Sequence, residues 1–406
     1  MSGNRVVITG IGVISPIGVG GKAFWESAVK GVCGIGEIKA FDTSKFKNHY
    51  GAEVKDFEPE NYICSDKMHK MGRASQFAIA ASKMAIEDSG LDLKSVNSKR
   101  IGVSLGTTMG EIQIEEKISE TWVKHGLQEV DSSEFIKYPS GCIPRNVAAE
   151  FNFNGPAMMI PTACAAGNYA IGYAFDLLRQ GKVDAMVAGG VDPFSRMAFT
   201  GFHRLRSIAP SICQPFDLNR KGIIVGEGAG ILLMETLDNA LKRGANIYAE
   251  VLGYGLGCDA HHMTAPHPEG LGGIRAIQAA LKCARISSDD IQYVSAHGTG
   301  TKENDRIETK IIKSVFKDRA KQVPMSSLKS MIGHTMGAAS AIEAVLCTYI
   351  VNNDIITPTI NYQEPDPECD LDYVPNAARE HKVNIALSNA YAFGGNDAAL
   401  LIGKFN

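Results

Sequence analysis

The 406-residue sequence contains no run of about 18 apolar residues, the length that a membrane-spanning helix requires. Its first residues, MSGNRVVITGIGVISPIG, also lack the continuous apolar segment of a secretory signal peptide. These two absences predict a cytoplasmic protein without a membrane span.

An excess of charge of one sign is missing as well, since 41 lysines and arginines stand against 44 aspartates and glutamates. Proteins that bind nucleic acid through its phosphates usually carry a strongly basic surface. The composition therefore gives no indication of nucleic-acid binding, and an acidic partner would have to meet a local basic patch.

The nine cysteines include no CxxC pair, and no spacing typical of metal ligands joins them to the ten histidines. This argues against the common zinc-binding patterns and predicts no metal, although a zinc site built from one cysteine and two histidines stays open. Free thiols in a reducing compartment fit the cysteine usage best.

What the sequence does contain is an alternation of strand and helix signals. Apolar runs such as Ile101–Leu105 and Ala185–Val187 alternate with helical segments such as Ser75–Asp88, and this pattern predicts an α/β fold. The length suits about two to three domains or one large duplicated domain. We place the midpoint near residue 246, which divides the chain into residues 1–245 and 246–406.

Three glycines, Gly10, Gly12 and Gly18, follow the first predicted strand, Arg5–Thr9. They suggest a dinucleotide-binding fingerprint, but Ser15 occupies the place of its third glycine. The sequence therefore gives only weak support to that interpretation.

Cys164 lies where a strand signal gives way to a helix signal. The apolar run Met158–Ile160 predicts a buried strand, Pro161 and Thr162 end it, and Ala165–Gln180 are rich in helix formers. The positive end of the helix dipole at such a turn favours a thiolate, which is the nucleophilic form of cysteine. The alternative is a buried structural cysteine, which is the usual fate of a free thiol.

Two histidines follow strand signals in the second half of the chain. His297 follows the predicted strand Ile291–Ala296, and Lys329 and His334 lie in SSLKSMIGHTMGAAS. Ligands in open α/β sheets favour the carboxyl ends of strands, so we expect these side chains to lie near Cys164. A cysteine nucleophile, imidazole donors and backbone amides are the parts that acyl transfer requires.

Six motifs resemble those of the β-ketoacyl-[acyl-carrier-protein] synthases, in particular the elongating type II group (3-oxoacyl-ACP synthase II) and the related type II polyketide ketosynthase subunits. They are PTACAAG, PFDLNRKGIIVGEGAG, DAHHMTAP, HGTGT, LKSMIGHTMGAAS and SNAYAFGG. The resemblance extends from Arg5 to Gly403. It implies a thiolase fold of two similar α/β halves in five layers (αβαβα), usually present as a homodimer.

The resemblance also implies a reaction, the decarboxylative condensation of an acyl group on Cys164 with malonyl-ACP. In this reaction, His297 and His334 promote decarboxylation. No metal or redox cofactor is implied. The substrates arrive on the phosphopantetheine arm of acyl carrier protein. The resemblance implies further roles for other residues. Lys329 and Glu343 would support the histidines, and Thr299 and Thr301 would bind the arm. The gating residue Phe393 would form an oxyanion hole with Cys164, and Met109, Ile223 and Ala392 would line an acyl pocket.

An acidic carrier protein would give a role to five basic residues. Three of them, Lys67, Lys70 and Arg73, are spaced so that they could share a helical face, and Arg204 and Arg206 lie further along the chain. A solvated surface without a partner is the simpler interpretation of these residues.

The chain departs from the family pattern at several positions. Ile223 stands where the family usually has Phe, Lys221 replaces a usual Asp, and Ala392 replaces Gly, while Asn396 and Asp397 replace Thr and Asn. These departures leave the substrate open but not the reaction class.

Three functions therefore remain in competition. The first is elongation of ordinary fatty acids. The second is a dedicated pathway to polyenes, polyketides or unusual lipids, with a chain-length-factor subunit as a possible partner in a heterodimer. The third is a noncatalytic subunit that binds carrier protein, and the presence of Cys164 argues against it.

Overall fold

The computed structural model describes residues 3–405, in which two sets of five strands have the same order. In the first half the order is β1 (Val6–Ser15), β8 (Gly228–Thr236), β7 (Ala185–Asp192), β5 (Ile101–Gly106) and β6 (Ala157–Ile160). In the second half the order is β9 (Ala249–Cys258), β15 (Asn396–Lys404), β14 (Ile385–Tyr391), β10 (Tyr293–Ser295) and β11 (Met325–Ser326).

The strand directions are repeated as well. β1 pairs antiparallel with β8, as β9 does with β15, and β5 pairs parallel with β6, as β10 does with β11. β1 and β9 pair with each other and join the two halves. The fold is therefore a duplicated α/β unit.

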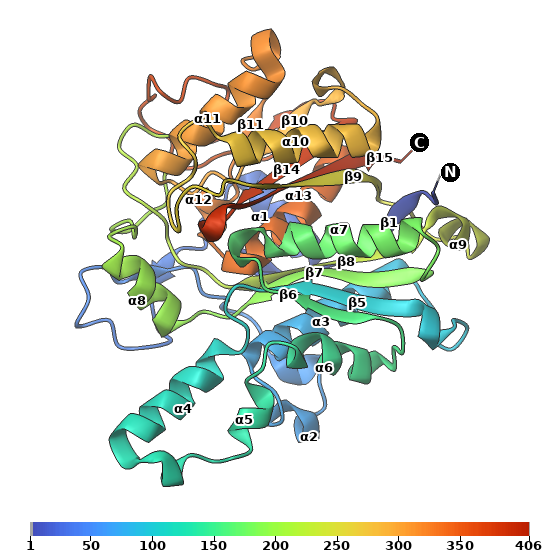
Figure 1. The fold of residues 1–406 in the computed structure, drawn as a ribbon, viewed down its shortest axis with the longest axis vertical. Helices are drawn as coiled ribbons and strands as arrows, with labels where there is room; N and C mark the ends of the chain where they lie inside the picture. Colours follow the sequence, from blue (N-terminus) through green and yellow to red (C-terminus); the bar gives the residue numbers. More distant parts are fainter. Residues whose placement is uncertain (1–2, 406) are drawn as a thin grey trace.

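Helices form three layers around these strands (Figure 1). The outer layer of the first half contains α3 (Arg73–Ser89) and α6 (Cys142–Phe151), and that of the second half contains α10 (Leu271–Ala284) and α11 (Lys302–Phe316). Between the sheets lie α7 (Ala166–Arg179) and α13 (Ala339–Asn353), which contact strands of both halves. This arrangement is the five-layered αβαβα order, and it confirms the predicted thiolase-type fold.

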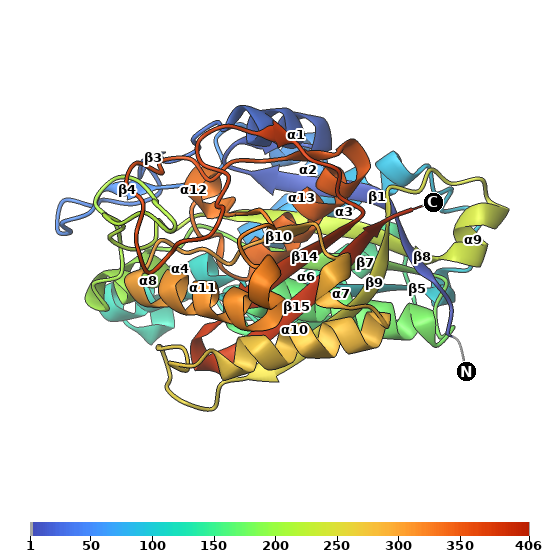
Figure 2. The same ribbon diagram turned by 90° about the horizontal axis from the view of Figure 1, so that it is seen from above.

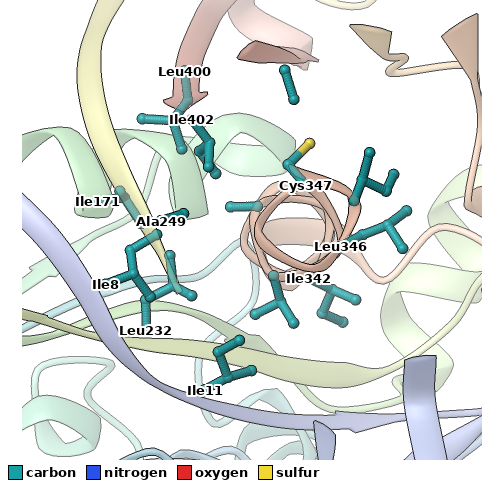
Figure 3. Close-up of a cluster of buried hydrophobic side chains, with 14 of the residues drawn as sticks. Ile8, Ile11, Ile171, Leu232, Ala249, Ile342, Leu346, Cys347, Leu400 and Ile402 are labelled. Carbon is teal, nitrogen blue, oxygen red and sulfur yellow. The ribbon is translucent and has the colours of Figure 1, made fainter. Parts of the chain in front are cut away.

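The central helix α13 is apolar on nearly all sides because it is enclosed by both sheets. Figure 3 shows Ile342, Leu346 and Cys347 of this helix within a cluster that includes Leu232 of the first half and Leu400 of the second. Burial of apolar surface on every side holds α13 firmly between the halves. The segment that precedes it is therefore attached to a rigid element.

The early glycines serve packing and form no nucleotide-binding turn. β1 continues through Gly10 and Gly12, and a Cβ atom on Gly12 would lie 1.8 Å from the carbonyl oxygen of Ala81 in α3. A Cβ atom on Gly10 would lie 2.0 Å from the carbonyl oxygen of Ala85. Glycine at these positions lets the strand and the helix approach closely.

The prediction that Met158–Ile160 forms a buried strand is wrong in one respect. The strand exists as β6, but Met158 is 42% exposed. β6 is an edge strand that pairs only with β5 in residues 3–405, so its other side lacks a neighbour. An apolar run alone cannot distinguish a central strand from an apolar edge.

A further segment projects from the layered body, toward the bottom of Figure 1. It contains α4 (Ile112–His125) and α5 (Glu134–Lys137), and it carries exposed apolar side chains, among them Trp122, Val123 and Ile136. None of the helices in residues 3–405 has the length and apolar character needed to cross a membrane.

We expect Gly12→Ala to destabilise the protein by about 1 to 3 kcal/mol, the usual cost of an extra methyl group in a packed interior. Gly201→Ala in α8 (Arg196–Arg204) is the control, because a Cβ atom there meets nothing within 4 Å and alanine favours a helix. Chemical denaturation measures the free energy of unfolding of both variants. Equal stability of Gly12→Ala and wild type would contradict the packing explanation.

Candidate active site

Cys164 occupies a single turn of 3-10 helix, Ala163–Ala165, between β6 and α7. The residue before it, Ala163, has a φ angle of 51°, in the left-handed region that alanine rarely adopts. This strained turn leads directly into the N-terminus of α7. The predicted strand-to-helix turn is thus present, and the cysteine is buried with 7% of its surface exposed.

In the resting protein, burial outweighs the expected effect of this turn on the Cys164 thiol. Burial raises the pKa of the Cys164 thiol to about 12, although the positive charge of Lys329 lowers it. Loss of hydration is the larger effect. The sulfur is therefore a thiol at neutral pH and must lose its proton when it reacts.

The two predicted histidines lie together. The ring centroids of His297 and His334 are 5.5 Å apart and the rings are nearly perpendicular, at 84°. Burial, with the charge of Lys329 adding to it, holds the pKa of both imidazoles well below the usual range. Nδ1 of His334 accepts the backbone N–H of Met336 at 3.2 Å. A neutral His334 in this arrangement carries its proton on Nε2, where it can be donated.

Lys329 and Glu343 form an ion pair in the interior. The Lys329 Nζ lies 2.5 Å from the Glu343 Oε1, and both residues are fully buried. Burial raises the pKa of Glu343 to about 7, although the Lys329 charge lowers it. Neither residue is on the wall of the cavity that contains Cys164, so the pair influences that cavity through its charges.

A cavity of about 480 Å³ contains Cys164, His297 and His334 on its wall. The other predicted site residues on this wall are Thr299, Thr301, Arg206, Ile223, Ala392 and Phe393. The hydroxyls of Thr299 and Thr301 are 2.9 Å apart. The structure thus brings together residues from both halves that are far apart in the sequence.

Met109 is absent from the wall of this cavity. Its backbone N–H donates to the carboxylate of Asp192 at 2.8 Å, and the N–H of Gly337 donates to the same carboxylate at 2.6 Å. Asp192 therefore ties the loop that contains Met109 to the segment that follows His334. The sequence offered one clue to Asp192, which is its position at the end of a buried strand.

The first three basic residues do not share a helical face, because the helix is interrupted. Lys67 lies in α2 (Ser65–Met68), whereas Arg73 begins α3. Arg73 pairs with the buried Glu227 at 2.8 Å, and Lys67 pairs with Glu150 at 2.8 Å. Lys70 is exposed. The charge of Arg73 is thus already neutralised inside the protein.

Arg204 and Arg206 are exposed at the end of α8 and just beyond it. Figures 1 and 2 both show α8 at some distance from α2, on another part of the surface. The five basic residues therefore do not form one continuous patch on this chain.

Three further residues at the site were not singled out from the sequence as site residues. Glu308 accepts the backbone N–H groups of His297 and Gly298, at 2.8 and 2.7 Å. Tyr391 is on the cavity wall with its ring centroid 5.8 Å from that of His297, and its hydroxyl is buried without a partner in residues 3–405. Asp397 also lines the cavity, and burial raises its pKa to about 8. Of the three, only Asp397 gave a sequence signal, as a departure from the family pattern.

Comparisons with known proteins agree with this geometry. The family model for the N-terminal domain of beta-ketoacyl synthase matches residues 3–240, and the model for the C-terminal domain matches residues 248–363. A 3-oxoacyl-[acyl-carrier-protein] synthase 2 from Staphylococcus aureus is 42% identical over 407 residues, covering 99% of this chain and 98% of that protein.

Solved structures give the same result. The ishigamide ketosynthase/chain length factor matches with a TM-score of 0.96 and 42% identity, and 100% of each chain is covered. A ketosynthase bound to a hexaketide, in complex with a type II PKS acyl-carrier protein, matches with a TM-score of 0.92 and 32% identity, again over 100% of each chain. With both domain models and full-length relatives matched, the chain belongs to the beta-ketoacyl synthase family.

Proposed function

We propose that the chain is a ketosynthase that loads an acyl group onto Cys164 and condenses it with malonyl-ACP. The products are 3-oxoacyl-ACP and CO2. The observation that carries this proposal is the presence of one buried cysteine and two neutral histidines on the wall of a single cavity. The identity of the chain to 3-oxoacyl-ACP synthase 2 supports the same reaction.

In the first half-reaction, the Cys164 sulfur attacks the thioester carbonyl of the incoming acyl group. A new sulfur–carbon bond forms, the old one breaks, and the carrier thiol leaves with the proton that Cys164 loses. The backbone N–H groups of Cys164 and Phe393 are the proposed donors to the oxyanion. The high pKa of the thiol means that its proton leaves as the sulfur attacks.

In the second half-reaction, the carbon–carbon bond to the malonyl carboxylate breaks and its electron pair remains as an enolate. His297 and His334 donate hydrogen bonds to the enolate oxygen, for which neutral imidazoles carrying one proton each are suited. The enolate carbon then attacks the acyl carbonyl on Cys164. The sulfur–carbon bond breaks, and the leaving Cys164 sulfur takes a proton from water.

In this proposal, residues 1–245 contribute the nucleophile and residues 246–406 contribute the histidines. Thr299 and Thr301 hold the phosphopantetheine arm of an acyl carrier protein. No metal or redox cofactor has a role, because loss of CO2 itself generates the carbanion. Lys70 and Arg204 are exposed and suited to an acidic carrier, whereas Arg73 is committed to Glu227.

A dimer is part of the proposal. The exposed edge of β6 and the apolar side chains on α4 and α5 offer surface that a second subunit would cover. We propose a second copy of this chain as that subunit. The similarity to a ketosynthase/chain length factor structure supports a paralogous partner as the alternative.

Incubation with acyl-ACP alone is expected to add one acyl mass to the wild-type protein and none to Cys164→Ala. His297→Ala and His334→Ala should still accept the acyl group, because their donors act on the later enolate, but malonyl decarboxylation should fall about a hundredfold or more. Intact-protein mass and CO2 release measure the two steps.

Two outcomes would overturn these roles. One is condensation at the wild-type rate in Cys164→Ala. The other is near-normal decarboxylation in both histidine variants. Failure of wild type to become acylated would favour the noncatalytic carrier-binding function.

Lys329→Met is expected to lower the free energy of unfolding by about 3 to 5 kcal/mol, because it leaves the Glu343 carboxyl buried without its partner. The double variant Lys329→Met/Glu343→Met should lose less than the sum of the single variants, since no uncompensated charge remains. Denaturant titration of the four proteins measures this coupling. Simple additivity would contradict a coupled buried pair.

A dedicated pathway is the second candidate function. Its support is the likeness to type II polyketide and ishigamide ketosynthases, together with Ile223 and Ala392 on the cavity wall. An aromatic ring at position 223 would fill the cavity differently from a β-branched chain. These positions touch the space for the acyl chain and leave the reacting groups in place.

Ile223→Phe/Ala392→Gly, which restores the family pattern, should shift relative kcat/KM across saturated and unsaturated acyl-ACPs by tenfold or more. A hydrophobic pocket discriminates by about 1 to 3 kcal/mol for each methylene-sized change. Steady-state kinetics with a panel of acyl-ACPs provides the measurement. If both proteins rank the panel identically and prefer ordinary saturated chains, fatty-acid elongation is the better assignment.

A further inference from the structure

Three positively charged residues on separate segments lie on the wall of the Cys164 cavity. Arg206, Lys221 and Lys302 are all exposed and all line this cavity. Backbone hydrogen bonds hold their segments side by side. The N–H of Gly222 donates to the carbonyl oxygen of Gly300 at 2.9 Å, and the N–H of Ile223 donates to that of Ser207 at 2.7 Å. Exposed residues on a cavity wall mark its mouth, so these charges gather there.

The charges of these three residues are not neutralised within the protein. None of them takes part in an ion pair within residues 3–405. The neighbouring Glu303 pairs instead with Arg306 at 2.6 Å. The positive charge at the mouth is therefore free to meet an anion from outside.

A fourth cation at this site, Arg220, is committed to structure. It is buried, and its Nη1 donates to the Asp366 carboxylate at 2.5 Å. Its Nε and Nη2 donate to the carbonyl oxygens of Thr301 and Lys302, each at 3.2 Å. Arg220 thus fixes the backbone from which Lys302 projects.

Two acids on the cavity wall, Asp259 and Asp397, are engaged within the protein. Asp259 accepts the backbone N–H groups of His267 and Gly272, at 2.8 and 3.0 Å. Asp397 is 2% exposed, and burial raises its pKa to about 8, so at neutral pH it is mostly uncharged.

We propose that Lys221 and Lys302, with Arg206, form a subsite that binds the phosphate of the phosphopantetheine arm at the cavity mouth. This inference rests on the proposed function, which brings the arm past Thr299 and Thr301 to Cys164. An ammonium group binds phosphate as a compact point charge with three donors.

Two sources supply the same chemistry, the arm on a carrier protein and free coenzyme A. Both present a phosphate at the end of the pantetheine chain. Lys221 and Lys302 would contact that phosphate in either case, and the relative affinities of coenzyme A and a phosphopantetheinylated peptide distinguish the sources.

The test measures binding of 4′-phosphopantetheine and of pantetheine to Cys164→Ala by calorimetry, so that no covalent step interferes. We expect phosphopantetheine to bind about tenfold more tightly, the scale of two or three partly exposed ion pairs. K221Q and K302Q, each in this background, should reduce the ratio of the two affinities by about threefold. K221D should reduce it further, because a like charge then faces the phosphate.

The matched control is K242Q, an exposed lysine in α9 (Leu237–Lys242), which lies at the opposite end of the molecule from α8 (Figures 1 and 2). It should leave the ratio at the value of the parent protein. Added salt should reduce the ratio in the parent and have little effect in the K221Q/K302Q double variant, because salt screens exposed charges.

Equal binding of the two ligands in the parent protein would overturn the subsite, and so would a ratio that survives in the double variant. Coenzyme A and a phosphopantetheinylated serine peptide are then compared, and the tighter ligand identifies the source. Tighter binding of either ligand supports the subsite. The binding measurement does not depend on condensation. If the ligands bind in a phosphate-dependent way but the protein never condenses substrates, the proposed function is refuted and the subsite is not.

Discussion

The positive charge of Lys329, enclosed in the protein interior, is the interaction on which the site depends. Burial lowers the pKa of His297 and His334, and the charge of Lys329 lowers it further, so both rings stay neutral. The same charge opposes the effect of burial on the pKa of the Cys164 thiol. A single charge acts on so many groups because the surrounding interior screens it weakly. Glu343 compensates that charge at 2.5 Å and so makes its burial tolerable.

The duplicated fold explains why these groups meet at one place. α7 follows β6 in the first half, and α13 follows β11 in the second half, so the two central helices occupy equivalent positions. Cys164 precedes α7, and His334 precedes α13. The beginnings of the two helices touch, since a Cβ atom on Gly167 would lie 2.6 Å from the backbone nitrogen of Ala341. Glycine at 167 thus permits the approach that brings nucleophile and histidine into one cavity.

The sequence predicted the regular elements well and the environment of their side chains less well. The helix expected at Ser75–Asp88 is α3, Arg73–Ser89, because its apolar spacing is a local signal. The exposure of β6 and the pKa of Cys164 could not be predicted, since both depend on which distant elements cover them. The contact of Glu308 with the His297 backbone was missed because it depends on how α11 packs, whereas the motif of His297 was visible locally.

The departures from the family pattern divide in a way that has a physical meaning. Of the five departures, Lys221, Ile223, Ala392 and Asp397 lie on the cavity wall together with Cys164, His297 and His334, whereas Asn396 is not among the residues of this wall. Contacts with the parts of a substrate that do not react determine which molecule is held and how it is placed, and they need not alter the bonds that break. A wall that changes around an unchanged cysteine and histidine pair is therefore the arrangement expected when one reaction is directed to a different acyl chain.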